Sequence, residues 1–252
     1  MTSLLGTVLR KAERLTNAVR EISNAAGRSA KLKIAPLQEA ALDERCILVD
    51  ELDRPLGDAS KRHCHQVDEH GDVPLHRAFS VFLFNKNGDL LLQKRAASKI
   101  TFPGYYTNTC CSHPLSEIPG EADEHQAVGI RRAARRRLHY ELGIPKNEVM
   151  PQDFCYLTRI HYQSTGDGKW GEHEIDYVLF LQKNEITLDP NPDEVSEIRW
   201  ISKDRMQEFV HGIDAPLTPW FNLILKHRLP LWWENLENLH SVQDHVTIQR
   251  FL

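Results

Sequence analysis

Apolar and polar residues follow several different periods along the chain. Two short apolar runs, residues 77–85 (RAFSVFLFN) and 89–95 (DLLLQKR), are separated by Asn87 and Gly88. An Asn-Gly pair between two such runs is a strong signal for a β-hairpin. Apolar runs or alternating patterns predict further strands at residues 45–50, 154–163, 174–182 and 195–201. The central part of the chain is therefore expected to form a sheet.

Helical periods occupy other parts of the chain. In residues 124–142 the apolar residues recur with a helical period, and Gly143 and Pro145 end the pattern. Shorter helices are predicted at residues 203–211, with Ser202 as the cap, at residues 219–228, which begin with Pro219, and in the tail, residues 230–252. The order of elements predicts an α+β fold in which helices flank a mixed sheet.

Residues 96–123 have no period and contain Gly, Pro and Ser throughout. A structureless stretch of this length inside a compact domain is usually functional. It contains the segment TNTCCSHP, residues 107–114, which is predicted to be a loop between regular elements. Its Cys111 and His113 offer either a nucleophile and its base or a proton donor beside a metal ligand. A pair of buried structural cysteines with a turn-capping histidine is the alternative, and the segment alone does not decide between them.

Residues 1–38 are basic and amphipathic. Seven Lys and Arg residues stand against two acids here, a charge of +5, which leaves −9 for the remainder given the total of −4. Apolar residues follow a helical spacing at Leu5, Val8, Ala12, Leu15, Val19 and Ile22. Such a start is typical of a mitochondrial transit peptide, with a docking helix or a frayed extension as the alternative. We therefore divide the chain into this extension and a domain over residues 39–252.

The composition is that of a soluble globular protein, with 41% apolar and 26% charged residues and no apolar run of the ~18 residues that a membrane helix needs. Five cysteines without a secretory signal favour reduced thiols in an intracellular compartment. The acidic charge of residues 39–252 argues against nucleic acid as the main partner. It does not exclude an anionic substrate, because local cations or a metal can reverse the field inside a pocket.

The segment WGEHEIDY, residues 170–177, carries two carboxylates, Glu172 and Glu174, at the mouth of a predicted strand. The period of a strand turns both to one face and His173 to the other. Two close carboxylates need a cation between them or must keep a proton, so they indicate a metal site or an acid/base pair. A solvated, charged strand edge is the alternative. Histidines that would complete a site suited to Zn or Mn are available at His63, His65, His76 and His113.

Cations flank the same segments. A diphosphate or carboxylate ligand beside a metal requires fixed positive charges, which could come from Lys61, Arg95 and Lys99. A denser basic run lies at residues 131–137, where we favour a solvated face paired with neighbouring acids.

Taken together, these segments resemble the type I isopentenyl-diphosphate isomerases, which have a Nudix-like fold. The general Nudix pattern ends in a cluster of glutamates. Here, in residues 136–144 (RRLHYELGI), Arg137 and Tyr140 replace two of them and Glu141 remains. A pyrophosphohydrolase needs that cluster to hold the metals that activate water, so hydrolysis is disfavoured. The matching segments are residues 61–76, 77–85, 95–99, 107–114, 131–144, 170–177 and 218–221 (TPWF).

The resemblance implies a Nudix-like α/β/α sandwich and a role for each matching residue. Cys111, Glu174 and Tyr162 would be catalytic. The substrate would be bound by Lys61, Arg95, Lys99, Ser112 and Trp220. One divalent ion, Mg²⁺ or alternatively Mn²⁺ or Zn²⁺, would be held by His65, His76, His113, Glu172 and Glu174. Glu141 would help to hold a second Mg²⁺ on the substrate diphosphate.

The implied activity is the interconversion of isopentenyl and dimethylallyl diphosphate in isoprenoid and sterol biosynthesis. We expect a monomer whose partner is a small-molecule diphosphate, without nucleic acid or membrane. Because the family is also found in the cytoplasm and in peroxisomes, these compartments are the alternatives to the mitochondrial localisation. A Nudix pyrophosphohydrolase and a catalytically inactive binding module are the alternative functions.

Overall fold

The structure, a computed structural model, describes residues 36–252. Most of the predicted N-terminal extension lies outside these residues, and the helix α2 (Pro36–Ala41) spans the proposed boundary at residue 38. The described residues belong to one compact unit. None of their helices combines the length and the apolar character that crossing a bilayer requires.

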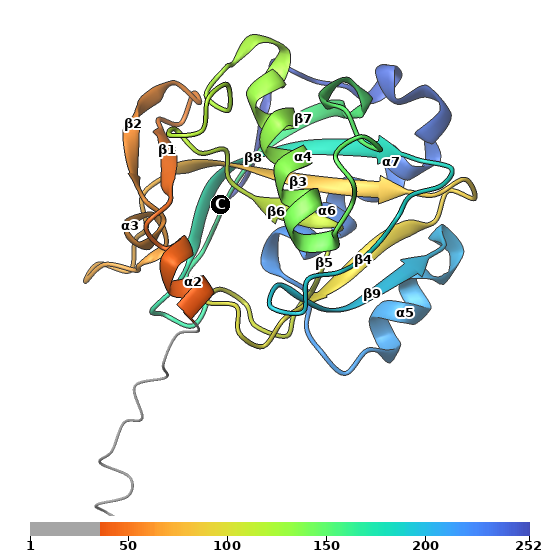
Figure 1. The fold of residues 1–252 in the computed structure, drawn as a ribbon, viewed down its shortest axis with the longest axis horizontal. Coiled ribbons are helices and arrows are strands. Elements are labelled where there is room, and N and C mark those ends of the chain that lie inside the picture. The colour runs from red at the N-terminus through yellow and green to blue at the C-terminus, as the bar shows by residue number, and fades with distance from the viewer. Residues whose placement is uncertain (1–35) are drawn as a thin grey trace, which may run out of the picture. The chain divides into compact units, whose positions relative to one another are not determined.

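The strands of the described residues form one mixed sheet (Figure 1). Its main path runs β10-β7-β8-β3-β1-β2, and β4, β5, β6 and β9 branch from it. The strands are β1 (Arg45–Val49), β2 (Pro55–Ser60), β3 (His76–Phe84), β4 (Leu90–Arg95), β5 (Tyr106–Thr107), β6 (Cys110–Ser112), β7 (Cys155–Ser164), β8 (Glu172–Gln182), β9 (Val195–Ile201) and β10 (Ile248–Phe251).

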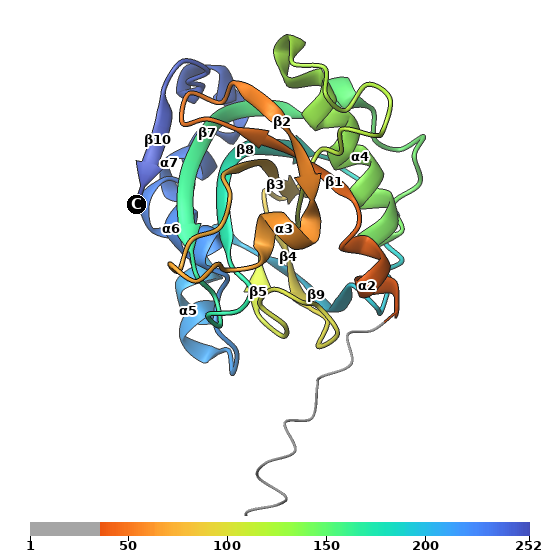
Figure 2. The same ribbon diagram turned by 90° about the vertical axis from the view of Figure 1, so that its left-hand side faces the viewer.

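Helices cover both faces of the strands β3 and β8. Figure 2 shows α4 on one side of them and α6 and α7 on the other. The helices that follow α2 are α3 (Lys61–His65), α4 (Val128–Leu142), α5 (Met206–Gly212), α6 (Pro219–His227) and α7 (Leu229–Glu234). This helix–sheet–helix order confirms the predicted α+β sandwich.

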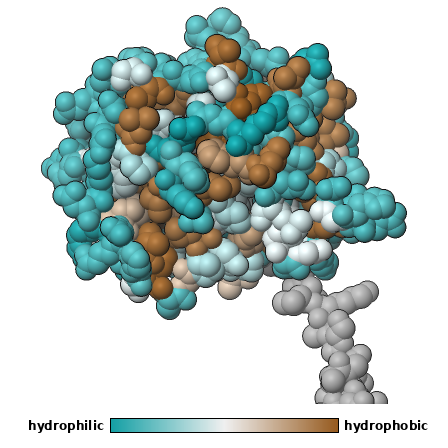
Figure 3. Space-filling view, turned by 180° about the vertical axis from the view of Figure 1, so that it is seen from behind, coloured by the Kyte–Doolittle hydropathy of each residue, from teal (hydrophilic) through white to brown (hydrophobic). Residues whose placement is uncertain are grey.

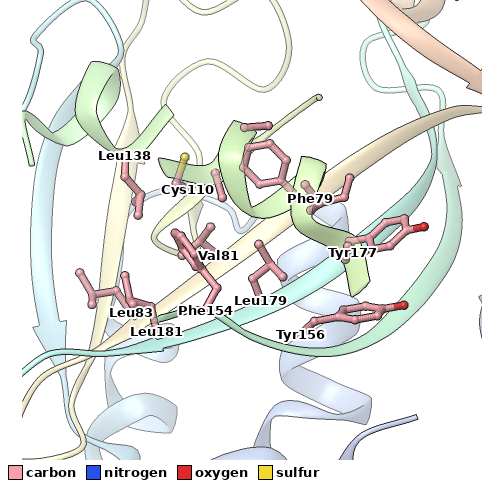
Figure 4. Close-up of a cluster of buried hydrophobic side chains, with 14 of the residues drawn as sticks. Phe79, Val81, Leu83, Cys110, Leu138, Phe154, Tyr156, Tyr177, Leu179 and Leu181 are labelled. Carbon is pink, nitrogen blue, oxygen red and sulfur yellow. The ribbon is translucent and has the colours of Figure 1, made fainter. Parts of the chain in front are cut away.

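Strand β3 is buried along its whole length, which explains its continuous apolar run. On one face, Phe79 and Val81 belong to the core cluster that contains Leu138 of α4 (Figure 4). On the other face, Phe82 packs against Phe221 of α6. The sheet therefore separates two apolar cores. Seen from behind, the surface has hydrophobic residues interspersed with hydrophilic ones (Figure 3).

The predicted hairpin is present only at its turn. β3 and β4 pair at Phe84 and Leu90 and then separate, so the longer hairpin was wrong. The physical reason is competition for the edge of β3: β6 pairs there, with Val81 opposite Cys110. β4 pairs instead with β9.

Other differences have the same origin. Residues 110–112 of TNTCCSHP form the strand β6 and not a loop, because β3 supplies their hydrogen bonds. The polar segment after β1 contains β2 and α3, and the tail ends in β10, which pairs in parallel with β7. Ser202 precedes a 3₁₀ turn but its side chain makes no capping hydrogen bond. None of these elements has a strong local signal, because each depends on partners far away in the sequence.

Candidate active site

Five buried side chains from four separate parts of the chain meet at one end of the sheet. Their nearest nitrogen and oxygen atoms all lie within 4.8 Å of one another. The parallel register of β3 and β8 places His76 directly beside Glu174. The cluster consists of His65 at the end of α3, His76 at the start of β3, His113 after β6, and Glu172 and Glu174 at the start of β8.

Hydrogen bonds to the backbone orient two of the histidines. His65 Nδ1 lies 2.8 Å from the carbonyl of Lys61, and His76 Nδ1 lies 2.9 Å from the carbonyl of Pro74. Each Nδ1 must therefore carry the hydrogen, which leaves each Nε2 as an acceptor in the neutral ring. These acceptors point into the cluster, toward carboxylate oxygens.

Acceptors that face acceptors require a cation or a proton between them. His65 Nε2 lies 3.0 Å from Glu172 Oε2, yet that oxygen has no hydrogen-bond partner among the described residues. Neutral imidazoles and carboxylates are the ligands that Zn²⁺ and related divalent ions take. The donor set therefore fits a divalent cation.

A proton can fill the same role when no metal is bound. Burial alone would lower the pKa of His76, but its interaction with the Glu174 carboxylate, 3.6 Å away, outweighs burial and raises the pKa to about 9. Burial and the neighbouring His65 and His76 push the pKa of His113 well below its usual range. His76 therefore carries a second ring proton near neutral pH, and His113 does not.

The two adjacent cysteines of β6 point to opposite faces of the strand. Cys110 is fully buried in the core beneath α4. Cys111 faces the pocket, where its thiol donates to Asn108 Oδ1 at 3.0 Å and accepts from Trp220 Nε1 at 3.0 Å. Burial, followed by the charge of Asp176, raises the pKa of Cys111 to about 12. The thiol is therefore protonated at physiological pH.

Glu174 occupies the other end of the same pocket. Tyr162 donates to its Oε2 at 2.5 Å. Burial opposes ionisation, but the neighbouring His76 and the hydrogen bond from Tyr162 prevail and hold the pKa of Glu174 below its usual range. The rings of Tyr162 and Trp220 lie 6.2 Å apart, so an aromatic pair connects the carboxylate to Cys111.

The pocket contains about 630 Å³ of empty space, including its open mouth. The three cations predicted to bind the substrate line it and are held by neighbours. Lys99 Nζ lies 2.6 Å from Glu194, Lys61 Nζ lies 3.6 Å from Glu44, and Arg95 donates to the carbonyl of Thr101 at 2.8 Å. The other predicted site residues that line it are Cys111, Tyr162, Trp220, Ser112, His65, His113, Glu172 and Glu174.

Three candidate residues do not line this pocket. His63, one of the candidate ligands, is exposed and lies outside the His/Glu cluster. His76 lies behind the cluster and is fully buried. Glu141 is also buried, and both of its oxygens are occupied: Arg137 donates to Oε1 at 2.7 Å and Gln93 donates to Oε2 at 3.1 Å. Arg137 lines the pocket itself. The predicted contact between Glu141 and a second Mg²⁺ stays a prediction that requires this pairing to open.

The arginine run does not form one solvated face. Arg132 is exposed and pairs with Asp123, as predicted. Arg137, however, is buried between Glu141 and Glu194, so the prediction is wrong at this position. The reason is that Arg137 lies on the side of α4 that faces Glu194, and Glu141, one turn further along the same helix, is its second ion-pair partner.

Sequence reasoning missed Asn108 and Asp176. Asn108 is buried and accepts hydrogen bonds from both Cys111 and Trp220. Asp176 is buried, accepts from Ser80 at 2.8 Å, and has its pKa raised well above the usual range by burial. The sequence could have indicated Asp176, because it continues the period of two set by Glu172 and Glu174 and therefore lies on the same face of the strand.

Comparison with known proteins identifies the family to which this chain belongs. The model of the NUDIX domain matches residues 74–221. The isopentenyl-diphosphate Delta-isomerase 1 of Mesocricetus auratus is 51% identical over 216 residues, which cover 84% of this chain and 94% of the relative. The isopentenyl-diphosphate Delta-isomerase of Dictyostelium discoideum is 44% identical over 221 residues, covering 85% and 92%.

Among solved structures, a protein from Deinococcus radiodurans has a TM-score of 0.50 and 20% identity, covering 73% of this chain and 99% of that one. At this identity the likeness shows the fold alone. The sequence relatives reach further, since they are 44–51% identical to this chain and the match covers more than nine-tenths of their length. By these relatives, this chain belongs to the isopentenyl-diphosphate Delta-isomerase family and carries a NUDIX domain.

Proposed function

We propose that this protein interconverts isopentenyl and dimethylallyl diphosphate, a step of isoprenoid biosynthesis, with Cys111 and Glu174 as the two proton-transfer groups. One observation supports this assignment above all. A protonated thiol and an ionised carboxylate lie at the two ends of an aromatic pair within one pocket. An isomerase that moves a double bond needs one group to give a proton and another to take one.

The reaction adds one proton to the alkene and removes another from C2. Cys111 would give its S–H proton, and the resulting thiolate would keep the hydrogen bond from Trp220 Nε1. Glu174 would take the C2 proton. In the reverse direction the two groups exchange roles, so the atoms balance.

A tertiary carbocation, or a species close to it, develops between the two transfers and must be kept from water. Trp220 and Tyr162 are both buried and present aromatic rings at this point of the pocket. A face-on aromatic ring stabilises a desolvated cation by ~0.5–2 kcal/mol. Exclusion of water also prevents capture of the cation as an alcohol.

The diphosphate would be bound at the mouth by Lys61, Arg95 and Lys99, with Ser112 as a hydrogen-bond donor. Burial lowers the pKa of Lys99 to about 8 despite its ion pair with Glu194, and an anionic ligand favours its charged form. Because the diphosphate does not react, its binding energy serves to orient the alkene.

A divalent ion fits the His/Glu cluster, and we propose Mg²⁺ there, with Mn²⁺ or Zn²⁺ as alternatives. When bound, it would supply positive charge that keeps Glu174 ionised and fixed. A second Mg²⁺ on the substrate diphosphate, held with the help of Glu141, belongs to the same proposal.

We further propose that the protein is a monomer that acts on small molecules. We propose no nucleic-acid partner, because residues 39–252 carry most of the acidic charge. Residues 1–38 are a proposed mitochondrial targeting extension, with the cytoplasm and peroxisomes as the alternatives. Sequencing the N-terminus of the protein isolated from its native cells tests this. Removal of about 38 residues is expected, and an intact N-terminus would contradict it.

The function is tested by incubating the full chain with isopentenyl diphosphate and Mg²⁺ in D₂O. Deuterium in dimethylallyl diphosphate is the expected result. Release of inorganic phosphate or pyrophosphate would indicate hydrolysis instead, and recovery of unlabelled starting material would indicate a binding module. Either of these results contradicts the proposed isomerase.

A further inference from the structure

A second cavity lies on the opposite face of the sheet from the His/Glu cluster. Neighbouring residues of a strand point to opposite faces. Thus His76 belongs to the cluster, whereas Arg77 lines the second cavity. The cavity holds about 900 Å³ of empty space, including its open mouth. Its charged and aromatic lining residues include Arg77, Arg131, Arg159, Asp53, Tyr156 and His245.

Positive charge is in excess here. The buried carboxylate of Asp53 is fully used: Arg77 Nε lies 2.8 Å from one oxygen and Arg159 lies 3.0 Å from the other, which also accepts from Tyr177. The side chain of Arg131 makes no ion pair or hydrogen bond with any residue that the structure describes, and its Nε is buried. The Nε of Arg159 is likewise buried without a partner.

A neighbouring acid marks where an anion would bind. Glu124 lies 2.9 Å from Arg77, but the Glu124 side chain is 55% exposed while that of Arg77 is 4% exposed. An ion pair with so exposed a partner contributes little stability, so another anion can replace Glu124 at small cost. The guanidinium beneath it is rigidly held by Asp53 and therefore preorganised.

Aromatic groups and a strained backbone complete the wall. The hydroxyls of Tyr156 and Tyr177 point the same way, out of the apolar core (Figure 4). The ring of His245 stacks on Tyr156 at 4.2 Å. Gln126 and Ala127 line the cavity with positive φ angles of 48° and 55°. Such strain costs free energy and tends to occur at functional sites.

We propose that this cavity is a binding site for a small oxyanion, a phosphate or a carboxylate, held by Arg131, Arg159 and Arg77. Guanidinium groups match the geometry of both anions and bind them with paired hydrogen bonds. The site does not depend on the proposed isomerase activity, because it lies on the other face of the sheet and shares no lining residue with the active-site pocket.

Equilibrium dialysis of the full chain against inorganic phosphate tests the proposal. Arg131→Gln should weaken one class of phosphate sites by about tenfold, the loss of one charge-assisted contact. The matched control, Arg132→Gln, removes the same charge from the next residue of α4, which pairs with Asp123 outside the cavity. It should bind phosphate as the unchanged protein does. Isomerase turnover should be the same in both variants.

Lys99→Ala identifies phosphate bound at the active site, because only that class should weaken in this variant. Malonate in place of phosphate tests whether the cavity accepts a carboxylate: each anion whose binding weakens in Arg131→Gln but not in Arg132→Gln is one that the cavity binds. If Arg131→Gln binds both anions as tightly as Arg132→Gln does, the proposal is wrong.

Crystals of the unaltered protein soaked in selenate give a second measurement that does not depend on the folding of a variant. Anomalous density between Arg131 and Arg159 is expected. Density confined to Lys61, Arg95 and Lys99 would overturn the oxyanion site.

Discussion

Two neighbouring cysteines illustrate how much one residue of offset decides. Cys110 and Cys111 have the same chemistry, but the alternation of β6 places one thiol in an apolar core and the other beside Asn108 and Trp220. The sequence alone does not show which of the two thiols faces the pocket, because this depends on the strand that contains them. The resemblance to a family predicted Cys111 as the catalytic thiol. The side chain of Cys111 faces the pocket, which is consistent with this prediction.

The raised pKa of Cys111 predicts a distinctive reaction with iodoacetamide. The thiolate is the reactive form, and burial raises the pKa to about 12, so the alkylation rate should keep rising through pH 9. Mass spectrometry of the Cys111 peptide after timed alkylation measures this. A plateau near pH 7–8 would mean that the thiol is already ionised and would contradict a proton donor.

Glu174 is predicted to act in the chemistry more than in binding. Glu174→Gln keeps the shape of the side chain and removes its charge, so turnover should fall by about 10²–10⁴-fold. The diphosphate should still bind, because Lys61, Arg95 and Lys99 are unchanged. Calorimetric titration with isopentenyl diphosphate measures the binding, and its loss would assign Glu174 a mainly structural role.

At the scale of elements, the sequence predicted those helices and strands whose formation depends mainly on local residues. The helix α4, its stop at Gly143 and the strands β7, β8 and β9 follow from apolar periods and turn residues. β6, α3 and β10 did not, since each is short and is stabilised by distant partners. The candidate site shows the same division. The period of two in β8 placed Glu172 and Glu174 together, whereas Asn108 beside Cys111 became visible only once β6 was known.

The end of α4 gives a test of this view. Gly143 has a φ of 65°, and a Cβ there would lie 2.3 Å from the carbonyl oxygen of Asp189. Gly143→Ala should therefore lower the free energy of unfolding by at least about 1–2 kcal/mol, the cost of a left-handed residue with a side chain. Denaturant unfolding measures it.

The matched control is Gly212→Ala at the end of α5, where a Cβ meets no atom within 4 Å. It should be neutral or slightly stabilising, by less than about 1 kcal/mol. Equal losses in the two variants would mean that the positive φ and the contact with Asp189 do not limit residue 143.

At the scale of the whole molecule, the sheet carries different chemistry on its two faces. One face gathers histidines, carboxylates and the thiol of Cys111, and on the other face three arginines and Asp53 line one cavity. Both sites draw on segments far apart in the sequence. The five metal ligands could be predicted from the sequence because they lie in family motifs. No motif predicted that Arg77, Arg131 and Arg159 would line one cavity.

The His/Glu cluster couples metal binding to pH. In the metal-free protein His76 has its pKa raised to about 9, so below that pH a metal must displace a proton. Affinity for Zn²⁺ or Mn²⁺ should therefore increase from pH 7 to pH 9. The melting temperature of chelator-treated protein should also rise when metal is restored.

Calorimetric titrations at several pH values and thermal scans check both effects. Glu172→Gln, which removes one ligand charge, should bind the ion more weakly. Metal affinity that is independent of pH, or a melting temperature that metal leaves unchanged, would contradict a metal site built from these histidines.

The central claim is that Cys111 and Glu174 move the protons of an isomerisation. The most direct measurement is the turnover of isopentenyl diphosphate by Cys111→Ala beside Cys110→Ala. We predict a loss of about 10²–10⁴-fold for Cys111→Ala. Cys110→Ala should retain most of its turnover while losing about 1 kcal/mol of stability from its buried core position. Comparable turnover in the two variants would contradict the account.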